Sequence, residues 1–238
     1  SDGKKFLVTN LSADLHTNYG FVGKEALKAA KPGDVLTTNA NNSLYVIEPS
    51  FLDLYRKIKR APQIMPLKDI AAIVAVRGIC KESLVVDAGT GSGALAFFLA
   101  NIVKKVVTYE VREDFFNLAT ENLKFLGLKN VVIKHKNVYD GIEEANVDLA
   151  CLDLPEPWKA VPAAEKALKV GGFLASYSPT VPQVSDFIAA VTANKKFIVV
   201  KTIEIIQREW EFNERVIRPR SQPIGHSGFL TFVRKISL

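Results

Sequence analysis

The fold of this chain follows from one stretch, Leu84-Val85-Val86-Asp87-Ala88-Gly89-Thr90-Gly91-Ser92-Gly93. Three apolar residues with a preference for strands lead into an acid, and three glycines then alternate with other residues. The apolar run Ala94–Ala100 follows directly and predicts a helix. A glycine-rich turn between a strand and a helix lets backbone N–H groups approach a ligand with no Cβ in the way, and the first helical turn adds unpaired amides. The stretch therefore predicts a ligand-binding strand–turn–helix unit.

The glycines alone do not identify the ligand, because Gly89, Gly91 and Ala94 also satisfy the looser dinucleotide fingerprint. Asp87 favours a different cofactor. An acid at the strand end would repel a pyrophosphate but can pair with a cation, and S-adenosylmethionine (SAM) carries both an ammonium and a sulfonium. We therefore expect SAM as the cofactor, with a nicotinamide dinucleotide and a turn that binds nothing as the alternatives.

From Leu84 onward, strand and helix patterns alternate, which is typical of a parallel sheet with helices on both faces. The expected fold is α/β: a doubly wound, mostly parallel, seven-stranded sheet of the Rossmann-like class I SAM-dependent methyltransferase type. Besides the strand that begins at Leu84, strands are predicted at 106–110, 131–133, 147–153, 173–177, 197–206 and 229–233. Helices are predicted at 68–76, 94–100, 112–126, 159–168 and 181–191.

The N-terminal region differs from the rest of the chain. Short strand candidates at 6–8, 35–38 and 44–47 are separated by turn signals, which predicts a small β-rich, barrel-like domain over residues 1–60 and a candidate RNA contact. The catalytic domain is expected over residues 61–238. Four of the five residues from Arg56 to Arg60 are basic, and this run either contacts phosphates or forms a solvated helix face.

Composition narrows the class of protein. The net charge of +6 and the pI of about 9.2 permit a nucleic-acid partner without establishing one. Cys80 and Cys151, the only cysteines of the sequence, have no Cys or His neighbour at metal spacing, so we expect no metal. No apolar run approaches the roughly 20 residues of a membrane helix, and the N-terminal segment has no signal-peptide core. We expect a cytoplasmic protein without membrane partners.

Two further motifs follow predicted strand ends. Glu110 stands near the usual distance from the glycines for an acid that binds ribose hydroxyls, although an acid there can also cap the next helix. Asp153-Leu154-Pro155-Glu156-Pro157-Trp158 follows the fourth strand, at the edge of the sheet where ligands bind. An acid, a stiff turn and an aromatic ring are typical of a pocket for an extruded base in nucleic-acid N-methyltransferases.

Together these motifs resemble the tRNA (adenine-N1)-methyltransferases of the TrmI type, which modify an adenine in the T-loop. The resemblance covers nearly the whole chain. It rests on Asp87–Gly93, Tyr109-Glu110, Leu152–Trp158, Tyr177-Ser178-Pro179, Gln183, Arg60–Gln63, Arg208-Glu209-Trp210 and Gly225–Leu230. It implies methyl transfer from SAM to N1 of an adenine at tRNA position 58, with position 57 as a second candidate, and it implies a homotetramer.

The resemblance also implies roles for residues. Asp153 would accept a hydrogen bond from the adenine amine and Tyr177 would wall the base pocket, so both are expected to be catalytic. The expected cofactor-binding residues are Gln63, Asp87, Gly89, Thr90, Gly91, Ser92, Gly93, Leu95, Glu110, Asn137, Val138 and Asp153. The expected RNA-binding residues are Arg56, Lys57, Lys59, Arg60, Trp158, Arg208, Arg218 and Arg220. His226 is expected to be structural, because no partner accompanies it.

The chain departs from the family pattern at two positions. Pro66 stands where the family usually has the tyrosine of Tyr-Pro-Lys-Asp, and Asn137 stands where an acid is common. Three other functions stay open: a class I methyltransferase acting on protein or a small molecule, an NAD-dependent oxidoreductase, and a non-catalytic RNA-binding subunit.

Overall fold

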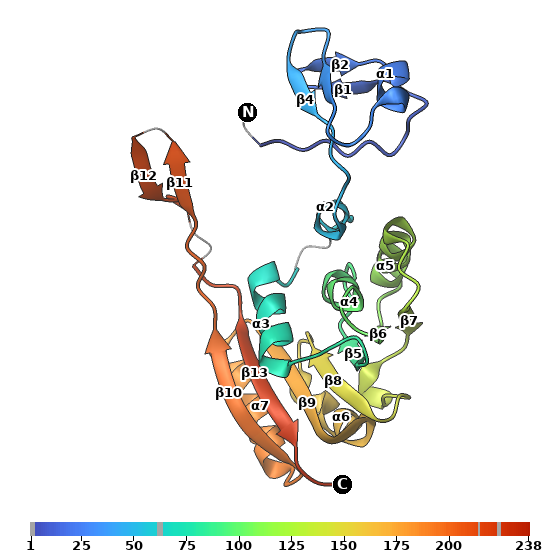
Figure 1. Cartoon of the computed structure of the whole chain (residues 1–238). Helices are drawn as coiled ribbons and strands as arrows, with labels where there is room; N and C mark the ends of the chain where they lie inside the picture. The colour runs from blue at the N-terminus through green and yellow to red at the C-terminus, as the bar shows by residue number, and fades with distance from the viewer. Residues whose placement is uncertain (1–2, 61–63, 214, 223–224) are drawn as a thin grey trace. The chain divides into compact units, whose positions relative to one another are not determined.

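The computed structural model describes residues 3–60, 64–213, 215–222 and 225–238 (Figure 1). The chain divides into two compact units, Ser1–Lys57 and Ile58–Leu238, whereas the boundary expected from the sequence follows residue 60. Among the described residues, no helix is long and apolar enough to cross a membrane.

The first unit is built from short antiparallel ladders. Thr38 organises it: this buried side chain donates a hydrogen bond to the Tyr19 carbonyl at 2.7 Å and accepts one from the Asn42 N–H at 3.1 Å. In the described residues the two ladders, β1–β2 and β3–β4, are separate two-stranded sheets. Residues 6–8, expected as a strand, are irregular, so that prediction is wrong. The elements are β1 Leu15–Thr17, β2 Gly20–Val22, α1 Lys24–Ala29, β3 Val35–Thr37, β4 Ser43–Tyr45 and α2 Phe51–Tyr55.

The second unit contains the seven-stranded sheet, with strand order β10-β13-β9-β8-β5-β6-β7 (Figure 1). Strands β5 to β9 are parallel, and β13 runs antiparallel to both β9 and β10. The doubly wound, mostly parallel sheet expected from the sequence is confirmed. Its strands are β5 Leu84–Ala88, β6 Lys105–Glu110, β7 Val131–His135, β8 Val147–Leu152, β9 Leu168–Ser178, β10 Phe197–Glu204 and β13 Phe229–Lys235.

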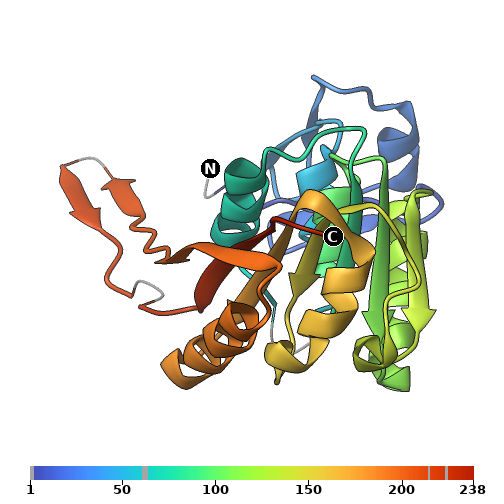
Figure 2. The same cartoon turned by 90° about the horizontal axis from the view of Figure 1, so that it is seen from below.

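Helices cover both faces of this sheet (Figure 2). On one face, side chains of α3 and α4 such as Ile70 and Phe97 pack on the strands. On the other face, α6 and α7 contribute Ala164 and Phe187. The helices are α3 Leu67–Arg77, α4 Ala94–Ala100, α5 Glu113–Leu126, α6 Val161–Ala167 and α7 Val181–Ala193, with single 3-10 turns η1 Val138–Asp140 and η2 Pro157–Ala160.

Alternation along the strands places three expected site residues on one face. Side chains two residues apart on a strand point to the same side. Val85, Cys151 and Ala175 pack in the cluster that α3 and α4 cover, so the residues two positions later, Asp87, Asp153 and Tyr177, start from that same face. These three residues belong to β5, to the end of β8 and to β9, which are neighbours in the sheet.

One element was not anticipated. The charged segment 207–228, where no strand is predicted, contains the antiparallel hairpin of β11 Trp210–Asn213 and β12 Val216–Pro219. The alternation of Trp210, Glu211 and Phe212 is the period-two signal of a strand, and the surrounding charges obscured it.

Candidate active site

The glycine turn connects β5 to α4 through three left-handed residues. The φ angles of Gly89, Gly91 and Gly93 are +90°, +53° and +85°. The N–H groups of Gly89 and Thr90 both donate to the Tyr109 carbonyl, at 3.1 and 3.3 Å. A Cβ on Gly89 would lie 2.0 Å from the backbone oxygen of Asp153. Only glycine therefore fits at position 89, because the end of β8 passes directly against the turn.

Asp87 lies beneath this turn with one carboxylate oxygen unpaired. Its Oδ2 accepts a hydrogen bond of 2.7 Å from the Thr108 hydroxyl, which lies 2.6 Å from the hydroxyl of Thr90. Its Oδ1 is buried and has no hydrogen-bond partner among the described residues. Burial, together with the charges of Asp153 and Glu110, raises the pKa of Asp87 to about 7 against the opposing effect of the Thr108 hydrogen bond. An unpaired buried carboxylate oxygen suits a cationic group of a ligand.

Asp153 follows β8 at the same edge. Its N–H donates to the Ala88 carbonyl at 2.9 Å, which holds the end of β8 against the end of β5. Burial raises the pKa of Asp153 to about 6. Because Leu152 pairs with Ser176 in the parallel register, Asp153 comes next to Tyr177. The edge therefore gathers two acids of raised pKa and an aromatic ring.

A buried ion pair holds Tyr177 in place. The Asp69 carboxylate, 1% exposed, accepts hydrogen bonds of 2.8 Å from both Lys68 Nζ and Ser227 Oγ. It also accepts a longer bond of 3.4 Å from the Tyr177 hydroxyl. A Cβ on Gly228 would lie 2.6 Å from the Tyr177 ring. Burial raises the pKa of Tyr177 to about 12, so the hydroxyl stays protonated near neutral pH.

Glu110 ends β6 with its carboxylate on three backbone donors. Oε2 accepts from the Gly91 N–H at 3.0 Å, and Oε1 accepts from the N–H groups of Val111 and Arg112, each at 2.9 Å. Glu110 thus braces the glycine turn and also occupies amides just before α5. The bonds to residues just before α5 agree with the interpretation of Glu110 as a group that occupies backbone amides there. Binding of ribose hydroxyls stays a prediction, for which the fourth lone-pair position of the carboxylate leaves an acceptor.

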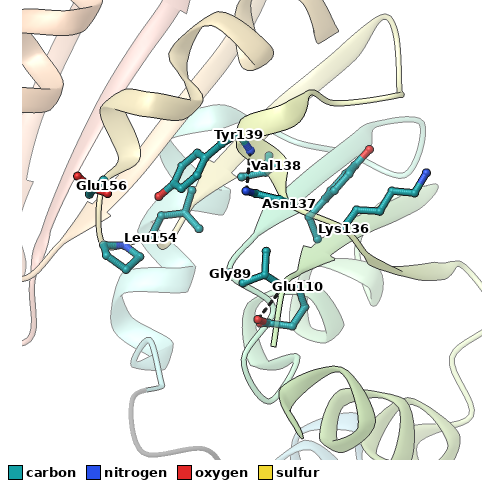
Figure 3. Close-up of a pocket in the computed structure, with 11 residues that line it drawn as sticks. Gly89, Glu110, Lys136, Asn137, Val138, Tyr139, Leu154 and Glu156 are labelled. Carbon is teal, nitrogen blue, oxygen red and sulfur yellow. Dashed lines mark hydrogen bonds between the residues drawn. The ribbon is translucent and has the colours of Figure 1, made fainter. Parts of the chain in front are cut away.

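A cavity of about 300 Å³ opens beside Glu110 (Figure 3). Asn137 and the buried Val138 line it, and Asn137 Oδ1 accepts from the Tyr139 N–H at 3.0 Å. Asp140, three residues after Asn137, is exposed and is not among the residues that line it. The lining residues are Gly89, Tyr109, Glu110, Val111, Lys136, Asn137, Val138, Tyr139, Leu154, Pro155 and Glu156. A mostly apolar lining with a few polar groups, among them the Glu110 carboxylate and the Asn137 amide, fits a nucleoside.

The remaining expected cofactor residues lie in or behind the turn. Thr90 and Ser92 are buried, and the Ser92 hydroxyl has no hydrogen-bond partner among the described residues. Leu95 is buried in α4 and packs in the core. Gln63 lies outside the described residues.

Two loops at this edge are held by side chains. Gln183 Nε2, in the first turn of α7, donates to the Pro155 carbonyl at 3.0 Å. Both ring nitrogens of His226 are within hydrogen-bond distance of oxygens, Nδ1 of Glu204 Oε1 at 2.5 Å and Nε2 of the Pro179 carbonyl at 2.8 Å. The pKa of His226 is raised, chiefly by the hydrogen bond with Glu204.

The expected RNA-binding residues are not gathered in one place. Within the second unit, Lys59 pairs with Glu121 of α5 at 2.7 Å, while Arg218 and Arg220 lie on the hairpin and pair with Glu211 and Glu209. The hairpin extends from the β10–β13 side of the sheet, and α5 covers the β6–β7 side (Figures 1 and 2). Arg60 and Arg208 are exposed, Trp158 is half-buried in η2, and Arg56 and Lys57 are exposed at the end of the first unit.

Sequence reasoning assigned no role to three polar residues of this region. Lys68 and Asp69 follow Pro66 closely in the sequence, and in the structure they hold Tyr177. Asn122 lies at helical spacing with the apolar side chains of α5, yet its side chain binds the backbone of Ser92 and of Lys59. A polar residue on the apolar face of an amphipathic helix was the available signal for Asn122.

Comparison with known proteins points to one family. Residues 44–218 match the family described as tRNA methyltransferase complex GCD14 subunit. The tRNA (adenine(57)-N(1)/adenine(58)-N(1))-methyltransferase TrmI of Methanocaldococcus jannaschii is 34% identical, over 98% of this chain and 92% of that protein. The tRNA (adenine(58)-N(1))-methyltransferase TrmI of Thermus thermophilus is 36% identical, over 92% of this chain and 88% of its own length.

Solved structures give the same fold. A SAM-dependent O-methyltransferase from Thermotoga maritima superposes with a TM-score of 0.90 at 31% identity, over 100% of this chain and 91% of the other. The tRNA (m1A58) methyltransferase TrmI from Aquifex aeolicus superposes with a TM-score of 0.84 at 26% identity, over 99% and 95%. The expected class I SAM-dependent methyltransferase fold is confirmed.

Proposed function

This chain belongs to the tRNA methyltransferase complex GCD14 subunit family, and from that premise we propose that it methylates N1 of an adenine in tRNA. The methyl donor is SAM. The acceptor is the T-loop adenine at position 58, with position 57 as a second candidate, as the names of the relatives indicate for those proteins.

One observation carries this proposal: two acids of raised pKa, the buried Asp87 and the half-buried Asp153, lie at adjacent strand ends beside a glycine turn. Asp87 offers an unpaired oxygen under the turn, which suits the ammonium of SAM. Asp153 lies next to Tyr177, where a base would enter. A reaction that begins with a cationic donor and ends with a cationic base is favoured by negative charge at both positions.

The chain promotes the reaction by positioning the two reactants and by stabilising charge, more than by transferring a proton. Bound SAM supplies a methyl group on a positively charged sulfur. Adenine N1 has an available lone pair, so the protein need not remove a proton before transfer. The glycine turn and Glu110 orient the nucleoside of the cofactor, and Tyr177 limits the motion of the base. Asp153 accepts from the N6 amine and stabilises the positive charge that develops on the ring.

The tRNA must present an extruded base, since a paired adenine cannot reach the edge of the sheet. Lys59, Arg60 and Arg208 contact phosphates, and Trp158 stacks on an exposed base. Arg56 and Lys57 extend the same role into the first unit, which contributes RNA contacts. Binding through phosphates predicts a strong dependence of tRNA affinity on salt.

We also propose that the protein forms a homotetramer in the cytoplasm, where its tRNA substrate resides. Trp210 and Phe212 of the hairpin are 53% and 75% exposed, and Ile217 is 60% exposed. Such large apolar side chains on one projecting element support a contact between subunits.

A second acceptor class is favoured by one finding, the likeness to the Thermotoga maritima protein, which is described as an O-methyltransferase. A hydroxyl acceptor would have to lose its proton, which requires a general base. Tyr177 is unsuited to that task because its pKa is about 12, so Asp153, whose pKa is raised to about 6, is the candidate base for such a reaction. The two TrmI relatives at 34% and 36% identity are named for a nitrogen acceptor, and this favours adenine N1.

The test is methyl transfer from labelled SAM to an unmodified tRNA transcript, followed by nucleoside analysis. We expect 1-methyladenosine from the native chain and a loss of methyl transfer of about 100-fold or more for Asp153→Ala. Asp186→Ala is the matched control, since Asp186 is exposed on α7. SAM binding without transfer to any transcript would contradict the proposal and support another substrate or a non-catalytic subunit.

A further inference from the structure

The side chain of Asn122 joins two parts of the molecule that the mechanism uses separately. This residue of α5 is 2% exposed. Its Nδ2 donates to the Ser92 carbonyl at 2.9 Å and to the Lys59 carbonyl at 2.8 Å. Its Oδ1 accepts from the Lys59 N–H at 2.9 Å. One buried amide thus binds the glycine turn and both polar backbone groups of Lys59.

Ser92 and Lys59, the two partners of Asn122, lie in the binding regions of two different ligands, the cofactor and the RNA. Ser92 lies in the turn that receives the cofactor, between Gly91 and Gly93. Lys59 lies in the basic run, and its exposed ammonium pairs with Glu121, the residue before Asn122. Ile58, which precedes Lys59, is buried at 5% exposure, so the backbone of this segment is anchored while its charged side chains face solvent.

The arrangement engages both polar atoms of the amide. An asparagine amide offers two donor hydrogens and an acceptor oxygen, and here all are used on backbone groups. If residue 59 shifts, the amide must follow it or lose two bonds, and the Ser92 carbonyl loses its donor at the same time. Order in the turn and order in the basic run therefore depend on one another.

On the basis of the proposed function, we propose that Asn122 is a positioning residue that couples cofactor binding to RNA binding. A ligand that orders the turn holds Asn122, and Asn122 then holds the backbone of Lys59 in the geometry that presents its ammonium to a phosphate. The second ligand meets a segment that is already ordered, so each strengthens the binding of the other by the same factor.

The coupling is measured with S-adenosylhomocysteine, which lacks the transferable methyl, and an unmodified tRNA transcript. In the native chain we expect S-adenosylhomocysteine to lower the Kd of the transcript about fivefold or more, the lower end of typical coupling. In Asn122→Ala the ratio of the two Kd values falls towards one. A native chain without coupling, or an Asn122→Ala variant that keeps the native ratio, overturns the proposal.

Asn130 provides the matched control. Its Nδ2 also donates to two backbone carbonyls, those of Ala100 and Val103, at 2.8 and 3.0 Å, but these lie at the far end of α4. Asn130→Ala removes a comparable pair of bonds and is expected to keep the native coupling. If Asn122→Ala does not fold, Asn122→Ser replaces it, because the shorter side chain keeps polarity and cannot reach both backbones.

Hydrogen exchange tests the idea without RNA or catalysis. S-adenosylhomocysteine should slow amide exchange in peptides that span Lys59 in the native chain and in Asn130→Ala, but not in Asn122→Ser. Unchanged exchange at Lys59 in the native chain overturns the proposal. The two proposals fail in different ways. If the proposed function is wrong, the native chain forms no 1-methyladenosine, whatever the amide exchange at Lys59 shows.

Discussion

The carboxyl edge of the seven-stranded sheet and the β11–β12 hairpin both carry charged side chains, in opposite surroundings. At the edge, Asp87 and Asp69 are each 1% exposed. On the hairpin, Arg220 and Glu209 form an ion pair of 2.8 Å whose side chains are 60% and 51% exposed. Charged side chains are therefore buried in the protein at the sheet edge and exposed to water on the hairpin.

This difference in burial determines which charged groups have shifted pKa values. At the edge, burial raises the pKa of Asp87 to about 7 and that of Asp153 to about 6. A cationic ligand favours the ionised form of both carboxylates, and its own binding is strengthened by their negative charge. On the hairpin, water and salt screen each pair, which leaves the charges available to a phosphate without tying the fold to them.

The largest expected effect comes from the turn itself. Gly89→Ala should abolish cofactor binding, because its Cβ would meet the Asp153 carbonyl at 2.0 Å and push the end of β8 away from β5. A displacement near 1 Å at a reacting centre costs about 100-fold in rate. Calorimetric titration with S-adenosylhomocysteine measures the loss. Gly127→Ala is the control: it has the same left-handed backbone but nothing within 4 Å, and it should keep native affinity.

The next effect is the pH dependence of catalysis. The value of kcat/KM for SAM should rise as the pH increases through the range from about 6 to about 7, because Asp153 and Asp87 must be ionised in the free enzyme. Below this range the value should fall about tenfold per pH unit for each required carboxylate. A profile that is flat from pH 5 to pH 8 would show that neither acid titrates near neutrality. The acids at the edge would then not differ in ionisation from the exposed charges of the hairpin.

A smaller effect is expected on stability. The folded pKa of Asp87 is raised above its unfolded value, so its contribution to stability is fully present below about pH 4 and is lost as the pH rises through about 7. Asp87→Asn should therefore stabilise the fold more at pH 8 than at pH 4, by about 4 kcal/mol, since the shift is about three pKa units and each unit corresponds to about 1.4 kcal/mol. Denaturant unfolding at the two pH values measures this difference, and an equal effect at both would contradict it.

The smallest expected effect lies on the hairpin. Arg220→Gln should leave the melting temperature unchanged, because its pairs with Glu209 and Glu211 are exposed. It should weaken tRNA binding modestly and reduce by about one the slope of the logarithm of the binding constant against the logarithm of the salt concentration. Fluorescence anisotropy over a range of salt concentrations measures both quantities. A large drop in melting temperature would show that the hairpin depends on its charges after all.

Local signals in the sequence were enough to predict the succession of strands, the glycine turn and the acids at strand ends. Asp87, Glu110 and Asp153 could be placed because each directly follows or ends an apolar run, and the carboxyl ends of parallel strands meet at one edge. Such signals can be read within about ten residues of chain. The residues that line the cavity after β7, Asn137 and Val138, came from the same reasoning together with the family resemblance.

The distant residues that support that edge emerged only from the packing of the folded chain. Lys68 meets Ser227 across 159 positions of sequence, and Asn122 meets Lys59 across 63. Nothing within either segment indicates its partner, because such contacts depend on how α3, α5 and the loop before β13 pack on the sheet. The ionisation of Asp87 and Asp153 likewise follows from burial by surrounding elements, since an aspartate in an open strand end keeps its ordinary pKa.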